Sequence, residues 1–529
     1  MKTLSSSLLS AQKGFGVSGA AYDAIWKIVL SRSGQTTRGY DINRVVQVQY
    51  SEEEDNIVAQ VLLDNSDAAI TGKDFEQYQC IYSRGYNTGV SRSAWVANTA
   101  YAVDDIVKPT TANGYQYRCT VAGTSHTTTE PTWGTALGVT QTDGVISPVT
   151  WEMDGNTGDE YAPHSPMKVD GQEFISSETQ LQCRLYLTGL PNQMKQDKAE
   201  SVYDQTDAST STCKTLITAI AAKTLATYTN YSAVTYTFEP VSASYPLGYD
   251  DSIIDSYAPK DYFSVQVNEN RDDKIQELLD YTRCKRRAGS DGAMHVFLPT
   301  LTGTTYDYEY RLEVSGYHTF FQKNLRNRFV NPNKEVVRSH PDHASQYTGS
   351  DTSATSYALS PKIHTTYRRL ASDAQAALIA DAIIERYELN AERGSAVVPM
   401  NCGQELFDYI KVTDASEGTT RTGNVQYIQE NCKVAGDRDD GYYNMTIRFG
   451  RLNTQSISFA GAQVVLKAAE RGATTETWKF AQLEYRIGLL EDDVETLFEN
   501  QKIMADYLNQ GVVPKWHVTQ LLQVPSAGV

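Results

Sequence analysis

Two neighbouring segments in which apolar and polar residues alternate constrain the fold of this chain most. Residues 44–50 place Val46, Val48 and Tyr50 on one face, and residues 56–65 repeat the alternation. A period of two belongs to a half-buried β-strand, whereas a helix repeats every 3.6 residues. The charged stretch SEEED separates the two runs. We therefore predict two antiparallel strands joined by a turn.

Further β segments follow the same rule. Alternation returns at residues 181–187 and on both sides of Asp440-Gly441, a dipeptide typical of hairpin turns. One helix interrupts them, because Ser372 and Gln375 match a capping box at the start of SDAQAALIADAIIERYELN. These patterns predict a fold that is mainly β with some α (α+β), built from β-barrel or sandwich domains.

The chain is too long for a single hydrophobic core. With 529 residues, it is expected to form several domains. We expect an N-terminal β domain over 1–93 and 157–200, an inserted module over 94–156, a mixed α/β domain over 201–370, a helix with a small β-barrel over 371–455, a linker over 456–475, a coiled-coil helix over 476–510 and an extended tail over 511–529.

Charge narrows the classes of partner. The net charge is −17, which argues against nucleic-acid binding as the main function. One basic cluster, Arg283 and 285–287, is typical of the solvated end of a helix, with a local phosphate patch as the alternative. No apolar run reaches the roughly 20 residues of a membrane span, and the first residues lack the apolar core of a signal peptide. We expect folding in a cytoplasm.

The sequence contains only weak matches to motifs of catalytic, cofactor-binding or metal-binding sites. The GFGVSG stretch, residues 14–19, matches a dinucleotide fingerprint but follows a serine-rich segment rather than a strand. The histidines of HPDH, residues 340–343, provide too few ligands for a metal, and DRDDG, residues 437–441, lacks the later glutamate of a calcium loop. The seven cysteines include no CxxC pair and are expected to be buried thiols. We predict no catalytic residue, cofactor or metal.

The C-terminal region repeats every 3.5 residues. Its heptad seam consists of Phe480, Ile487, Val494, Gln501 and Leu508 at the a positions and of Leu483, Leu490, Leu497 and Met504 at the d positions. Such spacing predicts a supercoil with partner helices, and an amphipathic helix packed on its own domain is the alternative. Branched residues at a with Leu at d also suit a dimer, and Gln501 does not settle the number of chains.

Aromatic residues concentrate in residues 95–151. Three of the six tryptophans lie there, together with NGYQYRC, EPTW and Asp143-Gly144. This pattern resembles the small chitin-binding-type carbohydrate module inserted in bacteriophage tail proteins, although Asp104 stands where that pattern has a glycine. The resemblance implies sugar contact, which we assign to Tyr115, Tyr117, Trp133 and Trp151. The alternative is that these rings form the core of a small domain.

Longer stretches resemble phage tail hub or tail-tip proteins. They are KTLSSSLLSAQK, FISSETQLQCRLYLTGL, MKQDKAESVYDQ, RRLASDAQAALIADAIIERYEL, FDYIKVTDASEGTTRTGNVQYIQENC and MTIRFG. The resemblance covers most of residues 1–455, and the order of these segments along the chain carries it. It implies a structural virion protein, a homotrimer that forms a ring below the tail tube and contacts a distal tail protein above and a tip or fibre protein below. A receptor-binding tail fibre and, from another class, a cell-wall glycan hydrolase are the alternatives.

Overall fold

The computed structural model describes residues 1–14, 23–177, 180–249, 252–312, 317–320, 322–326, 330–391, 393–415, 417–434 and 441–450. The predicted linker, coiled coil and tail lie outside these residues, as do most of GFGVSG and DRDDG. Seven α-helices and 29 strands are present in the described ranges, so the α+β class is confirmed. The sheets of these residues are open rather than closed barrels.

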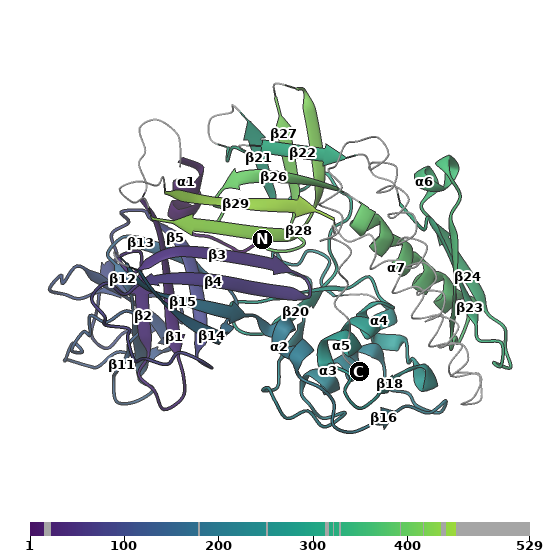
Figure 1. The fold of residues 1–529 in the computed structure, drawn as a ribbon, viewed down its shortest axis with the longest axis horizontal. Helices are drawn as coiled ribbons and strands as arrows, with labels where there is room; N and C mark the ends of the chain where they lie inside the picture. The colour runs from purple at the N-terminus through teal and green to yellow at the C-terminus, as the bar shows by residue number, and fades with distance from the viewer. Residues whose placement is uncertain are drawn as a thin grey trace, which may run out of the picture. The chain divides into compact units, whose positions relative to one another are not determined.

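A 14-stranded sheet organises the structure (Figure 1). Its longest path follows the order β2-β1-β5-β14-β15-β4-β3-β28-β29-β26-β22. Its strands are β1 Asp23–Ser31, β2 Arg38–Asp41, β3 Val45–Glu53, β4 Asn56–Asp64, β5 Gln79–Asn87, β13 Asp159–Pro163, β14 Met167–Ser176, β15 Leu181–Thr188, β21 Tyr308–Leu312, β22 Gln322–Arg326, β26 Arg393–Pro399, β27 Tyr409–Asp414, β28 Thr419–Lys433 and β29 Tyr442–Phe449. The short helix α1, Ser6–Gly14, precedes β1.

The predicted hairpin of the first two alternating runs is confirmed. Strands β3 and β4 pair antiparallel, with Gln49 opposite Gln60. A β-bulge between Val45 and Gln47 shifts the register, so Val45 is fully buried while Val46 is only partly buried. The expectation that Val46 faces the core was therefore wrong, because a bulge inserts one residue into the alternation.

The two ends of the described sequence meet in this sheet. Strand β28 pairs antiparallel with β3, and Asn431 lies opposite Gln49. Strands β28 and β29 also pair with each other, as the alternation around Asp440-Gly441 predicts. Figure 1 shows β29, β28, β3 and β4 side by side. One hydrophobic core, which includes Trp26, Tyr82, Ile428 and Met445, lies beneath both halves.

Residues between β5 and β13 build a separate small sheet. Its order is β11-β12-β9-β8-β6, beside a two-stranded β10-β7 pair. These strands are β6 Ser93–Ala94, β7 Ala100–Tyr101, β8 Ile106–Lys108, β9 Tyr115–Val121, β10 Gly123–Thr124, β11 Thr140–Asp143 and β12 Val149–Asn156. They have a core cluster of their own, and we call this segment, residues 93–156, the insert.

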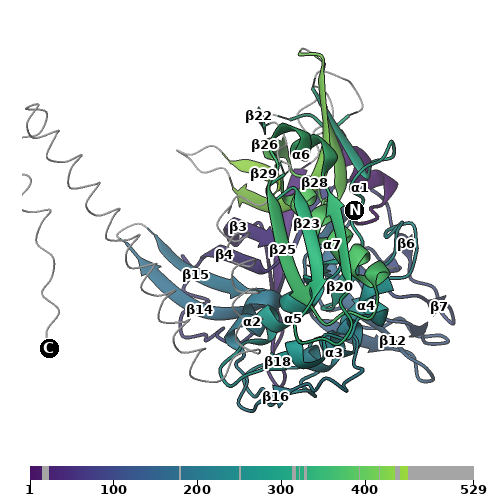
Figure 2. The same cartoon turned by 90° about the vertical axis from the view of Figure 1, so that its right-hand side faces the viewer.

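Helices and short sheets fill the middle of the sequence. They are α2 Leu190–Gln196, β16 Tyr203–Asp204, α3 Cys213–Ala221, β17 Tyr236–Phe238, α4 Ser252–Ser256, β18 Ser264–Val265, α5 Arg271–Leu279, β19 Lys285–Ala288, β20 Met294–Phe297, β23 Lys334–Ser339, β24 Thr348–Thr352, α6 Ala354–Leu359, β25 Ile363–Arg368 and α7 Asp373–Ala391. In Figure 2, α7 lies against the β23–β25 sheet. The expected cap of α7 is present, because Ser372 Oγ accepts from the Gln375 amide at 3.1 Å.

Two general expectations can be compared with the structure. All seven cysteines are buried thiols, as predicted. Among the described helices, none has the length and apolarity that crossing a bilayer requires.

Candidate functional site

The insert holds the four residues to which we assigned sugar contact. Tyr117 and Trp151 have no exposed surface, whereas Tyr115 and Trp133 are partly exposed. The rings of Tyr117 and Trp133 pack with centroids 4.3 Å apart. A buried ring cannot stack on a pyranose, so the core alternative accounts for Tyr117 and Trp151. Only Tyr115 and Trp133 present surface to a ligand.

Two carboxylates fix the tryptophans of the insert. The indole N–H groups of Trp95 and Trp151 both donate to Asp143 Oδ2, at 2.7 and 3.1 Å. Trp133 donates to Glu130 Oε1 at 2.7 Å, and Glu130 also accepts from the Thr110 amide. Each of these indole N–H groups is therefore satisfied, and the partly exposed ring of Trp133 is held by its hydrogen bond to Glu130 and by its packing on Tyr117.

The turn at Asp104 has a left-handed backbone conformation. Asp104 has φ of 73°, in the left-handed region. Asp is one of the few residues with a side chain that tolerate this region.

A second feature is an uninterrupted path of eight strands, β14-β15-β4-β3-β28-β29-β26-β22, which we call the eight-strand path. At one end, β14 pairs with β5 only through Met167 and Lys168, so its later residues have β15 as their sole described strand neighbour. At the other end, β22 pairs with β26 alone among the described strands. Within the described residues, both ends thus leave backbone donors and acceptors without a further strand partner.

Buried ion pairs join the two halves of the sheet. Arg84 Nε on β5 lies 2.9 Å from Glu430 Oε1 on β28, and His164 Nε2 lies 3.0 Å from Glu430 Oε2. All three side chains are buried. Burial lowers the pKa of His164 to about 4, and the nearby Arg84 cation acts in the same direction. At neutral pH, a neutral imidazole therefore completes an Arg–Glu pair.

Three of the four residues of the basic cluster predicted to be a solvated helix end, Lys285, Arg286 and Arg287, lie instead in strand β19, whereas Arg283 precedes the strand and is partly exposed. Lys285, Arg286 and Arg287 are at most 5% exposed. Lys285 Nζ pairs with Glu54 at 3.0 Å, Arg286 with Asp272 at 2.7 Å, and Arg287 with Asp408 at 3.2 Å. For these three residues the prediction was wrong, because each cation has a buried carboxylate partner in another element, which no local pattern reveals. These pairs attach the middle region to both halves of the sheet.

A small cavity lies within this junction. It has a volume of about 20 Å³ and is lined by Lys2, Glu52, Arg84, His164 and Arg287, among others. That volume holds about one water molecule. Burial raises the pKa of Glu52 to about 7. The cavity is too small for a substrate. We therefore assign a structural role to the junction, the group of buried ion pairs around Arg84 and Arg287, which fixes the relative position of the elements that it joins.

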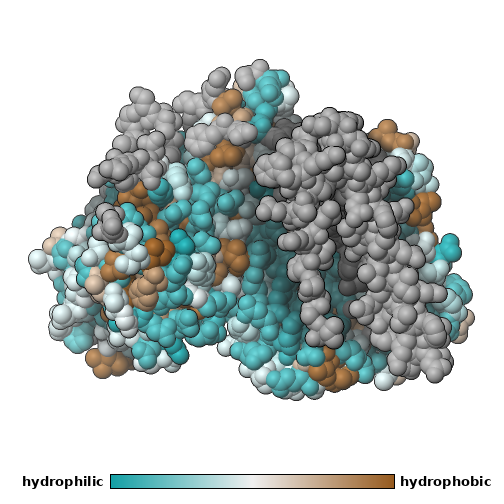
Figure 3. Space-filling model, in the orientation of Figure 1, coloured by the Kyte–Doolittle hydropathy of each residue, from teal (hydrophilic) through white to brown (hydrophobic). Residues whose placement is uncertain are grey.

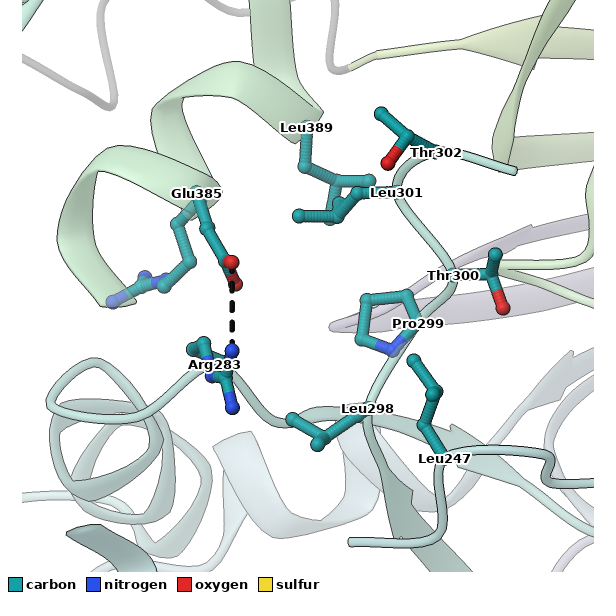
Figure 4. Close-up of a pocket in the computed structure, with 10 residues that line it drawn as sticks. Leu247, Arg283, Leu298, Pro299, Thr300, Leu301, Thr302, Glu385 and Leu389 are labelled. Carbon is teal, nitrogen blue, oxygen red and sulfur yellow. Dashed lines mark hydrogen bonds and ion pairs between the residues drawn. The ribbon is translucent and has the colours of Figure 1, made fainter. Parts of the chain in front are cut away.

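Figure 4 shows a larger groove of about 230 Å³ beside the C-terminal end of α7. Leu247, Leu298, Leu301 and Leu389 contribute its apolar lining. Arg283 and Glu385 form an ion pair at its side, with 3.5 Å between the charged atoms. Its volume is below that of most small-molecule pockets.

Groups suited to metal binding are absent from the described ranges. No cluster of three His, Cys, Asp or Glu side chains there has the arrangement of a metal site. Within HPDH, His340 pairs with Asp342, and Asp342 also binds Arg369. His340 therefore belongs to an ion-pair network, whereas the His343 ring contacts the backbone carbonyl of Ser345.

Comparison with solved structures finds similar folds. A tail protein from Neisseria meningitidis MC58 has 9% identity and a TM-score of 0.45, covering 81% of this chain and 97% of its own. The prophage MuSo2 43 kDa tail protein from Shewanella oneidensis has 9% identity and a TM-score of 0.41, over 80% and 98%. Prophage tail protein gp18 from Listeria monocytogenes EGD-e has 10% and 0.40, over 83% and 99%. Neither family models nor curated proteins match the sequence.

Proposed function

We propose that this chain is a structural component of a bacteriophage tail that forms the hub ring at the distal end of the tail tube. The observation that carries the proposal is the eight-strand path, neither end of which has a further strand partner along its full length among the described residues. The tail-hub resemblance of residues 1–455 supports the same assignment. In this role no residue carries catalysis, and the partners are further copies and neighbouring tail proteins.

The β3–β28 pair suggests how copies assemble. It joins two sheet halves edge to edge through backbone hydrogen bonds. If the β22 edge of one copy pairs with the β14 edge of the next, the contact is heterologous, and such contacts close into a ring when the rotation fits. Three copies would give about 24 strands, more than the 16–18 that enclose an aqueous channel in porins. We therefore favour a homotrimer with an open centre.

Cross-linking tests this arrangement. The native cysteines are all buried, so thiols introduced on strands β14 and β22 dominate labelling. We expect the double variant Ile175→Cys and Lys323→Cys, treated with a flexible bismaleimide, to yield covalent dimers and trimers and nothing larger. Each single variant should yield neither covalent dimers nor covalent trimers. Cross-linked species with more than three copies would contradict the ring. So would a double variant that forms oligomers in solution but gives no cross-linked product.

The insert supports a second function, contact with host-surface glycans. The observation that favours it is the half-exposed Trp133 ring, packed on Tyr117 and bonded to Glu130. A rigid exposed indole offers a flat face to a pyranose at little entropic cost. The variant Trp133→Ala should lose binding to host cell walls or chitin, with Val145→Ala as the exposed control in the same insert. Unchanged binding would exclude Trp133 as the contact.

A further inference from the structure

The turn between β11 and β12 is the most exposed aliphatic segment of the insert. Val145 is 82% exposed and Ile146 84%, the highest values of any large hydrophobic side chain among the described residues. Gly144 and Ser147, on either side, have φ of 105° and 50°, so the backbone turns sharply before and after the pair. A single exposed aliphatic residue is ordinary on a protein surface, whereas adjacent ones at a turn require an explanation.

Neighbouring segments add two more aliphatic residues to the same end of the insert. Strand β7 pairs antiparallel with β10, and the Asp104 amide donates to the Cys119 carbonyl at 2.9 Å. Val103 and Val121 lie between these two contacts, side by side, and are 54% and 53% exposed. Strand β10 also donates to the carbonyl of Ser147 at 2.8 Å, which joins it to the turn. The aliphatic tip, as we call this end, consists of Val103, Val121, Val145 and Ile146.

The segments that build the aliphatic tip contain no charged residue. Residues 94–103, 119–129 and 144–151 include no Asp, Glu, Lys or Arg, although these make up 21% of the chain. At the boundary, Asp104 pairs with Arg118 at 3.2 Å. Figure 3 shows hydrophobic patches on the side of the view where Figure 1 places β11 and β12. The tip can therefore enter an apolar medium without the large cost of removing a charge from water.

Buried hydrogen bonds hold the base of the turn. Asp143 is 3% exposed and accepts from the indole N–H groups of Trp95 and Trp151. Its other carboxylate oxygen accepts from the His126 amide at 2.9 Å. The base of the turn is therefore fixed before any contact is made, and docking of the tip costs little conformational entropy.

We propose that the aliphatic tip inserts into the apolar edge of a lipid bilayer. This proposal goes beyond the proposed function and does not depend on it. Protein interfaces are enriched in aromatic residues, Met and Arg, none of which the tip contains. The bilayer interior excludes charge, as the segments of the tip do. Because the tip has no cation, burial of aliphatic side chains rather than attraction to anionic headgroups drives the contact.

Co-flotation of the full chain with lipid vesicles tests the proposal. The wild-type chain should float with phosphatidylcholine vesicles equally at low and high salt. It should float less with vesicles rich in phosphatidylglycerol, because the net charge of the chain is −17. The double variant Val145→Asp and Ile146→Asp should bind phosphatidylcholine vesicles about tenfold more weakly, since carboxylates must then enter the bilayer.

The matched control for this variant places the same charges on exposed aliphatic residues elsewhere. It combines Val241→Asp with Leu359→Asp, whose native side chains are 69% and 74% exposed and lie outside the insert. The control should bind vesicles as the wild-type chain does. A wild-type chain that does not float, or an equal loss of binding in the control, would overturn the proposal.

Depth of insertion gives an independent measurement. Since all native cysteines are buried, Ile146→Cys provides one accessible thiol for an environment-sensitive fluorophore. Its emission should shift to the blue with phosphatidylcholine vesicles and be quenched by bromine on the lipid acyl chains, whereas labelled Val241→Cys should show neither change. A label at Ile146→Cys that stays in water would overturn the proposal. The hub and glycan proposals would be unaffected, because cross-linking and chitin binding are measured without lipid.

Discussion

Arg84 Nε lies 2.9 Å from Glu430 Oε1, and neither side chain is more than 3% exposed. Arg84 belongs to β5 and Glu430 to β28, so this ion pair ties the N-terminal strands to the C-terminal ones. A pair so deeply buried is costly to break, because removal of one charge leaves the other without a partner in a medium that solvates it poorly.

The variant Glu430→Gln should therefore lower the free energy of unfolding by about 3–5 kcal/mol. Glu173→Gln is the matched control, since the Glu173–Arg184 pair is 48% and 35% exposed and a pair of that kind contributes at most about 1 kcal/mol. Urea denaturation of both variants measures the difference. Equal effects would show that the buried pair does not stabilise the junction.

His164 should make the junction sensitive to acid. Its pKa is lowered to about 4 in the fold, below the ordinary value of 6.5. Between these values the unfolded chain binds more protons, so the contribution of His164 to stability falls as the pH falls from 6.5 to 4. Glu52 acts in the opposite direction, because its pKa is raised to about 7.

Comparison with a His164→Gln variant isolates the histidine from Glu52. The difference in unfolding free energy between wild type and variant should shrink as the pH falls from 6.5 to 4 and stay constant above pH 7. A pH-independent difference would mean that His164 keeps an ordinary pKa in the folded protein.

Gly39 on β2 marks a close contact with the insert. A Cβ atom there would lie 2.4 Å from the Leu137 carbonyl oxygen, well inside van der Waals contact. We expect Gly39→Ala to displace residues 134–138 and to cost about 1–3 kcal/mol, with altered fluorescence of the insert tryptophans. Gly134→Ala is the control, since its nearest neighbour would be 3.9 Å away. Normal stability of Gly39→Ala would show that the insert is not packed on β2.

The heptad seam of residues 480–508 is predicted to join three chains. We expect the full chain to have the solution mass of a trimer and a chain that ends at residue 475 to be a monomer, measured by light scattering. A trimer in both cases would assign assembly to the sheet edges alone. A full-length dimer would favour the two-stranded alternative.

Some of this architecture could be predicted from the sequence because the signals are local. Alternation in residues 45–64 predicted the β3–β4 hairpin, and Ser372 with Gln375 predicted the start of α7. The bulge at Val46 was missed, because a single extra residue leaves no distinct pattern. In the insert, the sequence shows which residues are aromatic but not which of their rings are exposed to solvent. The buried rings of Tyr117 and Trp151 therefore could not be distinguished from the partly exposed ring of Trp133.

The buried junction could not be predicted at all. Arg84, Glu430 and His164 come from three distant segments, and no local pattern marks any of them as buried. The pairing of β5 with β13 and of β28 with β3 determines their positions, so their burial depends on contacts between residues far apart in the sequence.

The central claim is that three copies close a ring through the open edges of the eight-strand path. A reconstruction of the tail tip by electron cryo-microscopy tests it most directly. We predict three copies around the tail axis, with β22 of each beside β14 of the next. Copies placed away from the axis, or a ring whose contacts leave both edges unpaired, would contradict the claim.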